Sequence, residues 1–234
     1  VRNARQVLLR GSRDSRSETD AAALTRGAED LAATLRALPA AQDLDVLRGL
    51  EGEAARQYFD RQPLLVKADL RPVFSMDGRT RRPPRDRMNA LLSFLYSMWM
   101  NDCRSALECA GLDPQVGFLH VLRPGRAALA LDLLEEFRSF ADRLALSLVN
   151  RHQIQEDDFT VSAGGGVSLN ADARKTVVVA FQERKQEEVQ HPVLKQALPL
   201  GLVPLVQARL MARAIRSEAD ESGPVTSYLP FLVR

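Results

Sequence analysis

The chain has 234 residues, of which 45% are hydrophobic and 26% are charged. This length and composition allow one sizeable buried core and argue against a disordered chain. The formal net charge is only +2, from 32 Lys and Arg against 30 Asp and Glu. Total charge therefore does not indicate nucleic-acid binding, and any DNA site must come from local clustering of basic residues.

Membrane insertion and secretion are not expected from the sequence. The longest apolar runs, such as 90–95 and 127–131, are far shorter than the ~20 residues of a membrane-spanning helix. The first residues lack the apolar stretch and cleavage site of a signal peptide, so we expect a soluble cytoplasmic protein.

Cys103 and Cys109 fit no zinc or redox spacing, and we expect them to be buried reduced thiols. Because Val1 lies in an expected helix, we also expect a missing upstream segment.

Helical periodicity dominates the chain. It predicts helices over 1–10, 17–38, 42–60, 84–110, 127–150, 171–190 and 204–220. Ser17 and Asn170 are expected N-caps, and Pro83-Pro84 suits the entrance to a helix. We predict a mainly α fold, with residues 1–41 as an N-terminal helical or linker segment and 42–234 as the main multi-helix domain.

One region departs from this helical pattern. Between 159 and 169, apolar residues alternate on either side of the glycine run 164–166, which predicts a short β-hairpin. A phosphate-binding loop is disfavoured there, because no Gly-Lys-Ser/Thr follows. The tail 218–226, with Gly223 and Pro224, is expected to be a surface loop.

A glycine-flanked acid stands out in the predicted helix 42–60. Glu51 lies at the border of an apolar stripe, between Gly49 and Gly52. Each of these glycines costs a helix about 1 kcal/mol relative to alanine, so close packing or the approach of a ligand is a physical reason to keep them. Taken alone, the segment favours an ordinary solvated glutamate at a helix edge.

Two further segments place ionisable side chains among apolar residues. His120 ends the run Gly-Phe-Leu-His, where a lone histidine is more often structural than a ligand. Asp132 and Glu135 are three positions apart, so they are neighbours on a helix surface. Glu136 falls one position further round, and we expect it to pair with Arg143 or to face solvent.

Together these residues suit a divalent cation. Carboxylates 4 Å apart repel by about 4 kcal/mol per pair at an effective dielectric of ~20, and a cation removes that cost. Carboxylate oxygens with one imidazole fit Mg²⁺ or Mn²⁺, and Mn²⁺ is better matched to nitrogen. Such an ion would activate water or a DNA 3′-hydroxyl. The spacing alone is only moderately specific, because such residues arise by chance in many helical proteins.

A basic cluster precedes the predicted helix that carries Asn89. It is a plausible phosphate-binding edge, although a solvated loop is about equally consistent with the sequence alone. The proposed neighbouring metal site favours contact with DNA. The cluster consists of Arg79, Arg81, Arg82, Arg85 and Arg87.

Four motifs occur in order along the chain. They are Leu-Arg-Gly-Leu-Glu-Gly-Glu-Ala-Ala-Arg-Gln-Tyr-Phe at 47–59, Arg-Arg-Pro-Pro-Arg-Asp-Arg-Met-Asn-Ala-Leu-Leu-Ser-Phe-Leu-Tyr at 81–96, Gly-Leu-Asp-Pro-Gln-Val-Gly-Phe-Leu-His at 111–120, and Leu-Ala-Leu-Asp-Leu-Leu-Glu-Glu-Phe-Arg at 129–138. This series resembles the CRISPR-associated spacer-acquisition integrase family. The likeness continues through Gln182-Glu-Arg-Lys, His191-Pro and Tyr228-Leu-Pro-Phe-Leu, and looks most like the subtype I-C and I-G branch.

The resemblance implies roles for individual residues. Glu51, His120 and Glu135 would bind Mg²⁺ or Mn²⁺. Asp132 would support the site or the substrate, and Asn89 would lie in the same pocket. The implied activity is that of a metal-dependent DNA endonuclease and transesterase, which inserts protospacer DNA at the leader-repeat junction of a CRISPR array. Hydrolysis of branched DNA would use water at the same site.

The resemblance also implies partners. These are double-stranded protospacer and repeat DNA, a small ferredoxin-like adaptation subunit and a RecB-like adaptation nuclease. The family's N-terminal β-rich domain, which helps to form its homodimer, is absent from this chain, and that puts independent dimerisation in doubt. Residues 222–227 are a second departure, for which we have no physical account.

Two other readings of the residues stay open. One is a non-catalytic helical scaffold that binds DNA or a partner through the arginine cluster. The other is an unrelated metal hydrolase acting on small phosphoesters. A metal-dependent break in a DNA strand separates the integrase from the scaffold, and a chromogenic phosphodiester separates it from the small-substrate hydrolase.

Overall fold

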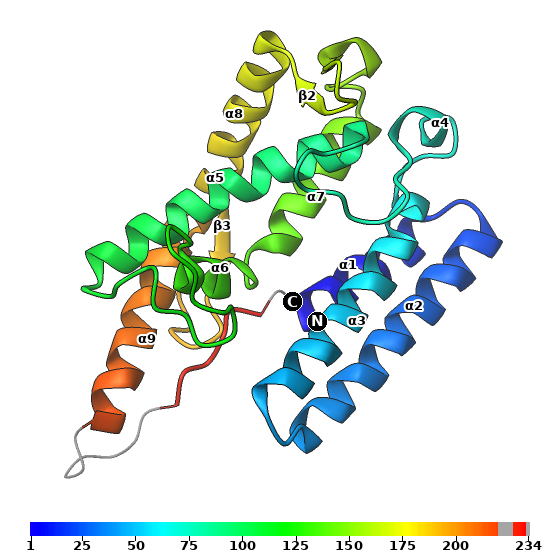
Figure 1. Cartoon of the computed structure of the whole chain (residues 1–234). Coiled ribbons are helices and arrows are strands. Elements are labelled where there is room, and N and C mark those ends of the chain that lie inside the picture. The colour runs from blue at the N-terminus through cyan, green and yellow to red at the C-terminus, as the bar shows by residue number, and fades with distance from the viewer. Residues whose placement is uncertain (220–226, 233–234) are drawn as a thin grey trace. The chain divides into compact units, whose positions relative to one another are not determined.

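A computed structural model of the chain describes residues 1–219 and 227–232 (Figure 1). The predicted mainly α fold is confirmed. The helices are α1 Arg2–Asp14, α2 Glu18–Ala37, α3 Leu44–Arg61, α4 Arg71–Phe74, α5 Arg87–Cys109, α6 Ala128–Leu134, α7 Arg138–Asn150, α8 Ala171–Gln186 and α9 Val203–Ala219. The strands are β1 Phe159–Val161, β2 Val167–Leu169, β3 Glu188–Gln190 and β4 Ala197–Pro199.

The described residues form two compact units. Unit 1 contains residues 1–95 and 139–179, and unit 2 contains residues 96–138, 180–219 and 227–232. Helices α5 and α8 each contribute residues to both units. Gly223 and Pro224, in the predicted surface loop, lie outside the described residues. No helix in the described part of the chain is both long and apolar enough to cross a membrane.

Unit 1 begins with three helices packed side by side, α1, α2 and α3 (Figure 1). Leu8 on α1 and Leu24 and Leu31 on α2 have no exposed surface, so they form the centre of this packing. The side chain of Ser17 accepts a hydrogen bond from the backbone N–H of Asp20 at 3.2 Å, which confirms the predicted N-cap of α2.

The predicted hairpin is also present in unit 1. Strands β1 and β2 pair antiparallel, with Phe159 opposite Leu169. Asn170 then caps α8, because its side-chain oxygen accepts from the N–H of Ala173 at 2.8 Å. The turn and cap signals in this stretch were therefore sufficient to predict its local structure.

Unit 2 is organised around aromatic side chains. Trp99 has no exposed surface, stacks on Phe137 with ring centroids 5.2 Å apart, and meets Phe181 edge-on at 5.2 Å. Phe231 stacks on the other side of this cluster, 6.2 Å from Phe137. The segment near the C-terminus is thus part of the core of unit 2.

Two predicted helices differ from the structure: one is shorter than predicted, and the other is interrupted. The helix predicted over 171–190 ends at Gln186, because residues 188–190 pair with 197–199 as a second antiparallel hairpin. The helix predicted over 127–150 breaks after Leu134. At the break, the N–H groups of Glu136 and Phe137 bond to carbonyls three residues back, at 3.2 and 2.8 Å, in place of the four-residue helical pattern.

Candidate functional site

His120 and Asp132 form a closely bonded pair in unit 2. The Nδ1 atom of His120 lies 2.6 Å from Oδ1 of Asp132. The same carboxylate accepts hydrogen bonds from the backbone N–H groups of Phe118, Leu119 and His120 at 2.8, 3.1 and 2.9 Å. Three successive donors and one imidazole therefore enclose Asp132, whose side chain is 1% exposed. Asp132 thus fixes the conformation of the loop that carries His120, and its predicted role in the site stays a prediction.

Hydrogen bonding offsets burial at this carboxylate. Desolvation raises the pKa of Asp132, but the bonds from the His120 side chain and from the backbone of His120, Phe118 and Leu119 together leave the pKa below its ordinary value. These bonds therefore favour the ionised form of Asp132.

The glycine of Gly-Phe-Leu-His has a steric reason. A Cβ at Gly117 would lie 2.8 Å from the carbonyl carbon and the Cβ of Ala128, and 2.8 Å from Oδ2 of Asp132. No side chain fits there without displacing α6. Gly117 thus allows the loop to approach Asp132 closely enough for three N–H groups to reach it.

This arrangement leaves one nitrogen of His120 for another ligand. Among the described residues, Nε2 of His120 has no hydrogen-bond partner, and the side chain is 19% exposed. Histidines that bind metals commonly donate their second ring nitrogen to a carboxylate, which fixes the tautomer and the direction of the free nitrogen. The donor chemistry of the His120–Asp132 pair fits a metal ligand.

Glu135 lies at the break between α6 and α7. Its carboxylate is 2.7 Å from the guanidinium of Arg138, and both side chains are largely buried. Arg138 also stacks over the ring of Tyr96, 5.3 Å from its centroid. Sequence analysis did not identify Arg138, although the three-residue spacing from Glu135 is a signal for such a pair.

The prediction for Glu136 was wrong. Its carboxylate is buried, and it accepts hydrogen bonds from the hydroxyl of Tyr228, from Nε2 of Gln207 at 2.7 Å and from the N–H of Phe231 at 2.6 Å. Burial raises the pKa of Glu136 despite these three donors. The helix break turns Glu136 toward the closing segment near the C-terminus, and that long-range contact could not be read from local spacing.

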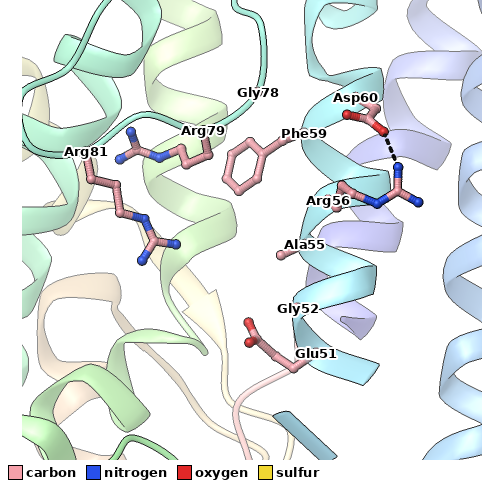
Figure 2. A pocket seen from close by; sticks show the side chains of 9 residues that line it. All are labelled: Glu51, Gly52, Ala55, Arg56, Phe59, Asp60, Gly78, Arg79 and Arg81. Atoms are coloured by element: carbon pink, nitrogen blue, oxygen red, sulfur yellow. Dashed lines mark hydrogen bonds and ion pairs between the residues drawn. The ribbon is translucent and has the colours of Figure 1, made fainter. Parts of the chain in front are cut away.

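Glu51 lies in unit 1, at the edge of a pocket between α3 and the loop that precedes α5 (Figure 2). The pocket has a volume of about 290 Å³. Glu51 and Arg81 point into the same space from opposite walls (Figure 2). The lining residues are Glu51, Gly52, Ala55, Arg56, Phe59, Asp60, Gly78, Arg79 and Arg81.

Glu51 and Glu53, which lie two residues apart on α3, have different surroundings. Glu53 is bound by Arg56 at 2.7 Å and by Gln57 at 2.9 Å. Those contacts lower the pKa of Glu53, first through the hydrogen bond from Arg56. Glu51 has no hydrogen-bond or ion-pair partner in the described part of the chain. Of the two, Glu51 is the acid available to a ligand.

Asn89 is buried and holds the loop that precedes α5 by hydrogen bonds from its side chain. It has no exposed surface. Its side-chain oxygen accepts from Arg79 at 2.6 Å and from the N–H of Thr80 at 3.2 Å, while its amide donates to Gly78 at 3.0 Å and to Asp86 at 2.6 Å. Both ends of the amide are engaged, so Asn89 positions the loop and does not present a free group to a substrate.

The five arginines of the cluster divide into two groups. Arg79, Arg85 and Arg87 are bound within unit 1, to Asn89 and Ser93, to the carbonyl of Gly164, and to Glu156 respectively. DNA contact by these three arginines stays a prediction, and it would have to compete with their internal partners. Arg81 and Arg82 are exposed and have no partner among the described residues, so they are the members of the cluster free to bind phosphate.

Two further arginines in the loop after His120 were missed. Arg123 is exposed and Arg126 half-buried, and neither side chain has a partner in the described part of the chain. They belong to unit 2, within six residues of His120. Their proximity in sequence to a candidate ligand was the signal that could have found them.

The predicted metal ligands fall in different units. Glu51 belongs to unit 1, and His120 and Glu135 belong to unit 2. Within the described residues, no group of three or more His, Cys, Asp or Glu side chains could hold a metal ion. In particular, Asp132 and Glu135 are directed to different partners, His120 and Arg138. The metal site remains a prediction.

Comparison with known proteins places this helical chain in the class of CRISPR-associated proteins. The family model described as "CRISPR associated protein Cas1" matches residues 1–183. The chain is 55% identical over 235 residues to CRISPR-associated endonuclease Cas1 1 of Moorella thermoacetica, and 48% identical over 235 residues to the protein of that name from Chlorobaculum tepidum. The chain belongs to the Cas1 family, as its motifs indicated.

These matches cover all of this chain but only 66% of each of those two relatives. A Cas4/endonuclease Cas1 fusion of Rhodospirillum rubrum is 39% identical over 231 residues, which are 97% of this chain and 38% of the fusion. The subtype I-C or I-G assignment stays a prediction.

Solved structures agree with this family. A Cas1 protein from Thermotoga maritima is 27% identical with a TM-score of 0.73, over 91% of this chain and 64% of that chain. A partial Cas6-RT-Cas1–Cas2 complex is 25% identical with a TM-score of 0.72, over 97% of this chain and 67% of its own. A casposase bound to integration product, at 20% identity and a TM-score of 0.76 over 99% of this chain and 63% of that chain, shares the fold.

Proposed function

We propose that this chain carries the catalytic part of a DNA endonuclease and integrase that inserts protospacer DNA into a CRISPR array at the leader-repeat junction. The single observation that carries the proposal is the His120–Asp132 pair. It sits in the motif that defines the family resemblance, and it leaves Nε2 of His120 without a hydrogen-bond partner among the described residues. The names of the relatives, CRISPR-associated endonucleases, support the same activity.

We propose Glu51, His120 and Glu135 as ligands of Mg²⁺ or Mn²⁺. A carboxylate from unit 1 together with an imidazole and a carboxylate from unit 2 is the hard and borderline donor set that these ions accept. The ion would supply Lewis-acid activation of water or of a DNA 3′-hydroxyl.

The chain's own residues have separate parts in this proposal. Asp132 holds the imidazole of His120 in one tautomer and orientation. Arg138, beside Glu135, offsets the negative charge of that carboxylate when no cation is present. Arg81 and Arg82 bind the phosphates of the incoming strand, because their guanidinium groups are not used within the described protein.

The partners are proposed from the names of the relatives. A Cas4 exonuclease is fused to the Cas1 part of the Rhodospirillum rubrum relative, and Cas2 is named in the complex that shares this fold. We propose that the whole protein works as a homodimer with the small ferredoxin-like adaptation subunit and with a RecB-like nuclease, on double-stranded protospacer and repeat DNA.

The proposal is tested with single variants in Mn²⁺-dependent strand transfer and in cleavage of branched DNA. We expect Glu51→Ala, His120→Ala and Glu135→Ala to abolish both reactions while the helical circular dichroism spectrum is kept. Glu53→Ala is the matched control for the first variant, since Glu53 is paired on the exposed side of the same turn. Full activity in all three site variants would reject the metal site.

The same assay distinguishes the scaffold alternative. A non-catalytic scaffold would bind DNA through Arg81 and Arg82, with affinity falling as salt rises, and would break no strand at any Mn²⁺ concentration. Hydrolysis of a chromogenic phosphodiester without any action on DNA would instead indicate a small-substrate hydrolase.

A further inference from the structure

We propose that the closing segment, residues 228–231, holds the Glu135 carboxylate in place by acting through Glu136. The inference rests on the proposed function only in taking Glu135 as a metal ligand. It makes Glu136 a positioning residue, which touches neither the metal nor DNA. All the residues that carry the inference belong to unit 2.

The first observation is the backbone at the break between α6 and α7. The N–H groups of residues 135, 136 and 137 bond to carbonyls three residues back, at 3.3, 3.2 and 2.8 Å. This pattern has poorer hydrogen-bond geometry than an α-helix, and it turns by about 120° per residue in place of about 100°. Each residue that returned to the α-helical pattern would rotate its side chain by about 20° relative to α6. The direction of the Glu135 side chain therefore depends on contacts that keep the break as it is.

The closing segment supplies such contacts at Glu136. The buried carboxylate of Glu136 accepts hydrogen bonds from the hydroxyl of Tyr228 and from the N–H of Phe231, the latter at 2.6 Å. A third donor is Nε2 of Gln207 at 2.7 Å. The same nitrogen also donates to the Tyr228 hydroxyl at 2.9 Å and to the carbonyl of Leu229 at 3.2 Å. These three donors are therefore either in the closing segment or bound to it.

Phe137, the next residue of the break, is held by the same segment. Its ring stacks on those of Trp99 and Phe231, with centroid distances of 5.2 and 6.2 Å. Phe231 thus contacts two successive residues of the break, Glu136 through its N–H and Phe137 through its ring. Because both residues that follow Glu135 are fixed, the backbone at Glu135 is not free to turn.

Glu135 and Glu136 are neighbours in sequence, but their side chains have different surroundings. The Glu135 side chain is 27% exposed and pairs with Arg138 at 2.7 Å, whereas Glu136 lies in the core. A metal ligand has to be held within about 0.5 Å of its working position. Since one backbone joins the two acids, the anchoring of Glu136 limits where the Glu135 carboxylate can reach.

The test combines Mn²⁺ binding to the whole chain, measured by calorimetry, with hydrogen exchange measured in EDTA. Glu136→Gln is the main variant, because it keeps the size of the side chain but turns an NH₂ group toward the donors. We expect it to weaken Mn²⁺ binding by about tenfold, the low end of the losses seen when support is removed from metal ligands. In EDTA, amide exchange at residues 135–137 should become about tenfold faster, with a smaller change at residues 97–109 of α5.

Two further variants separate positioning from general stability. Ala106→Gly weakens α5 inside unit 2, because glycine disfavours a helix interior, and it should lower Tm without changing Mn²⁺ binding. Tyr228→Phe removes one donor to Glu136 and introduces no NH₂ group, so it should be better tolerated than Glu136→Gln. It should still weaken Mn²⁺ binding, by about twofold, and it carries the test if Glu136→Gln does not fold.

Each other outcome counts against the inference. If Glu135→Ala weakens Mn²⁺ binding but Glu136→Gln and Tyr228→Phe do not, the positioning role is wrong while the proposed metal site stands. Equal weakening by Ala106→Gly would show that Mn²⁺ binding follows stability alone. Unchanged exchange at residues 135–137 would mean that the closing segment does not hold the break. If the wild type binds no Mn²⁺, the proposed metal site fails, and the positioning role fails with it.

Discussion

The imidazole of His120 and the carboxylate of Asp132 approach to 2.6 Å across twelve residues of chain. The three acidic side chains at the end of α6 each bind a different partner, and this pair is the first of those contacts. Asp132 holds the histidine loop, Glu135 pairs with Arg138, and Glu136 binds the closing segment near the C-terminus. Three acids within five residues thus have three different functions, and of the three only Glu135 is partly exposed.

Asp132→Asn should weaken Mn²⁺ binding to the protein by about 10- to 100-fold, as the loss of a carboxylate partner does at other metal-bound histidines. The amide also turns an NH₂ group toward backbone donors, which should cost about 1–3 kcal/mol of the free energy of unfolding. Mn²⁺ binding by calorimetry and urea unfolding measure the two effects. Unchanged Mn²⁺ affinity would show that Asp132 has no influence on the metal.

Gly117→Ala should destabilise the protein by about 1–3 kcal/mol, because its Cβ would overlap Ala128 and the carboxylate of Asp132. Gly164→Ala is the control, since a Cβ there meets nothing within 4 Å. Urea unfolding of the two variants and the wild type makes the comparison. Equal midpoints for Gly117→Ala and Gly164→Ala would mean that the loop can move away from α6 at no cost.

The lowered pKa of Asp132 predicts how the free energy of unfolding changes with pH. Hydrogen bonds outweigh burial and hold the folded pKa below the value of an unfolded aspartate, about 3.9. The ionised group therefore stabilises the fold fully above that pH, and its contribution is lost as pH falls through the folded pKa. The difference in unfolding free energy between wild type and Asp132→Asn should shrink as pH falls below about pH 4.

Local signals predicted local structure well. Ser17 and Asn170 cap the helices as expected, and the glycine run produces the first hairpin. The second hairpin was not predicted, because its turn at 191–196 contains no glycine to signal it. The break after Leu134 was not predicted, because its cause is not local: Glu136 is drawn to Phe231, 95 residues away. Periodicity contains no information on such contacts.

In the candidate site, too, the sequence predicted which residues are involved but not how the fold arranges them. The motifs identified His120, Asp132 and Glu51 by type, but the sequence could not say that Asp132 would be enclosed by three backbone N–H groups. The sequence also could not distinguish the arginines that are bound within the protein from those that are exposed. A count of charges treats Arg79 and Arg82 alike, whereas the fold uses the first to hold Asn89 and leaves the second exposed.

Removing the acceptor at Glu136 should affect stability strongly. Glu136→Ala leaves the buried Tyr228 hydroxyl, the Gln207 amide and the Phe231 N–H without this partner, so we expect a loss of about 3 kcal/mol or more. Tyr228→Phe removes one donor to Glu136 and one acceptor of the Gln207 amide, which keeps Glu136 and the carbonyl of Leu229 as acceptors, so it should cost less, about 1–2 kcal/mol. Chemical unfolding followed by tryptophan fluorescence reports on this core, because Trp99 stacks on Phe137. Equal losses in the two variants would contradict the three-donor arrangement.

Arg82 and Arg79 allow a test of which arginines bind DNA. Arg82 has no partner among the described residues, so Arg82→Gln should leave Tm unchanged and weaken binding to duplex DNA, with a salt slope reduced by roughly 0.9. Arg79 is bound to Asn89 and Ser93, so Arg79→Gln should lower Tm first, because it leaves the buried amide of Asn89 without a charged donor. Binding titrations at several salt concentrations, with melting curves beside them, distinguish the two residues. If Arg79→Gln keeps its Tm and alone flattens the salt dependence, the assignment is reversed: Arg79 would leave its internal partners to bind phosphate, and Arg82 would be an ordinary solvated side chain.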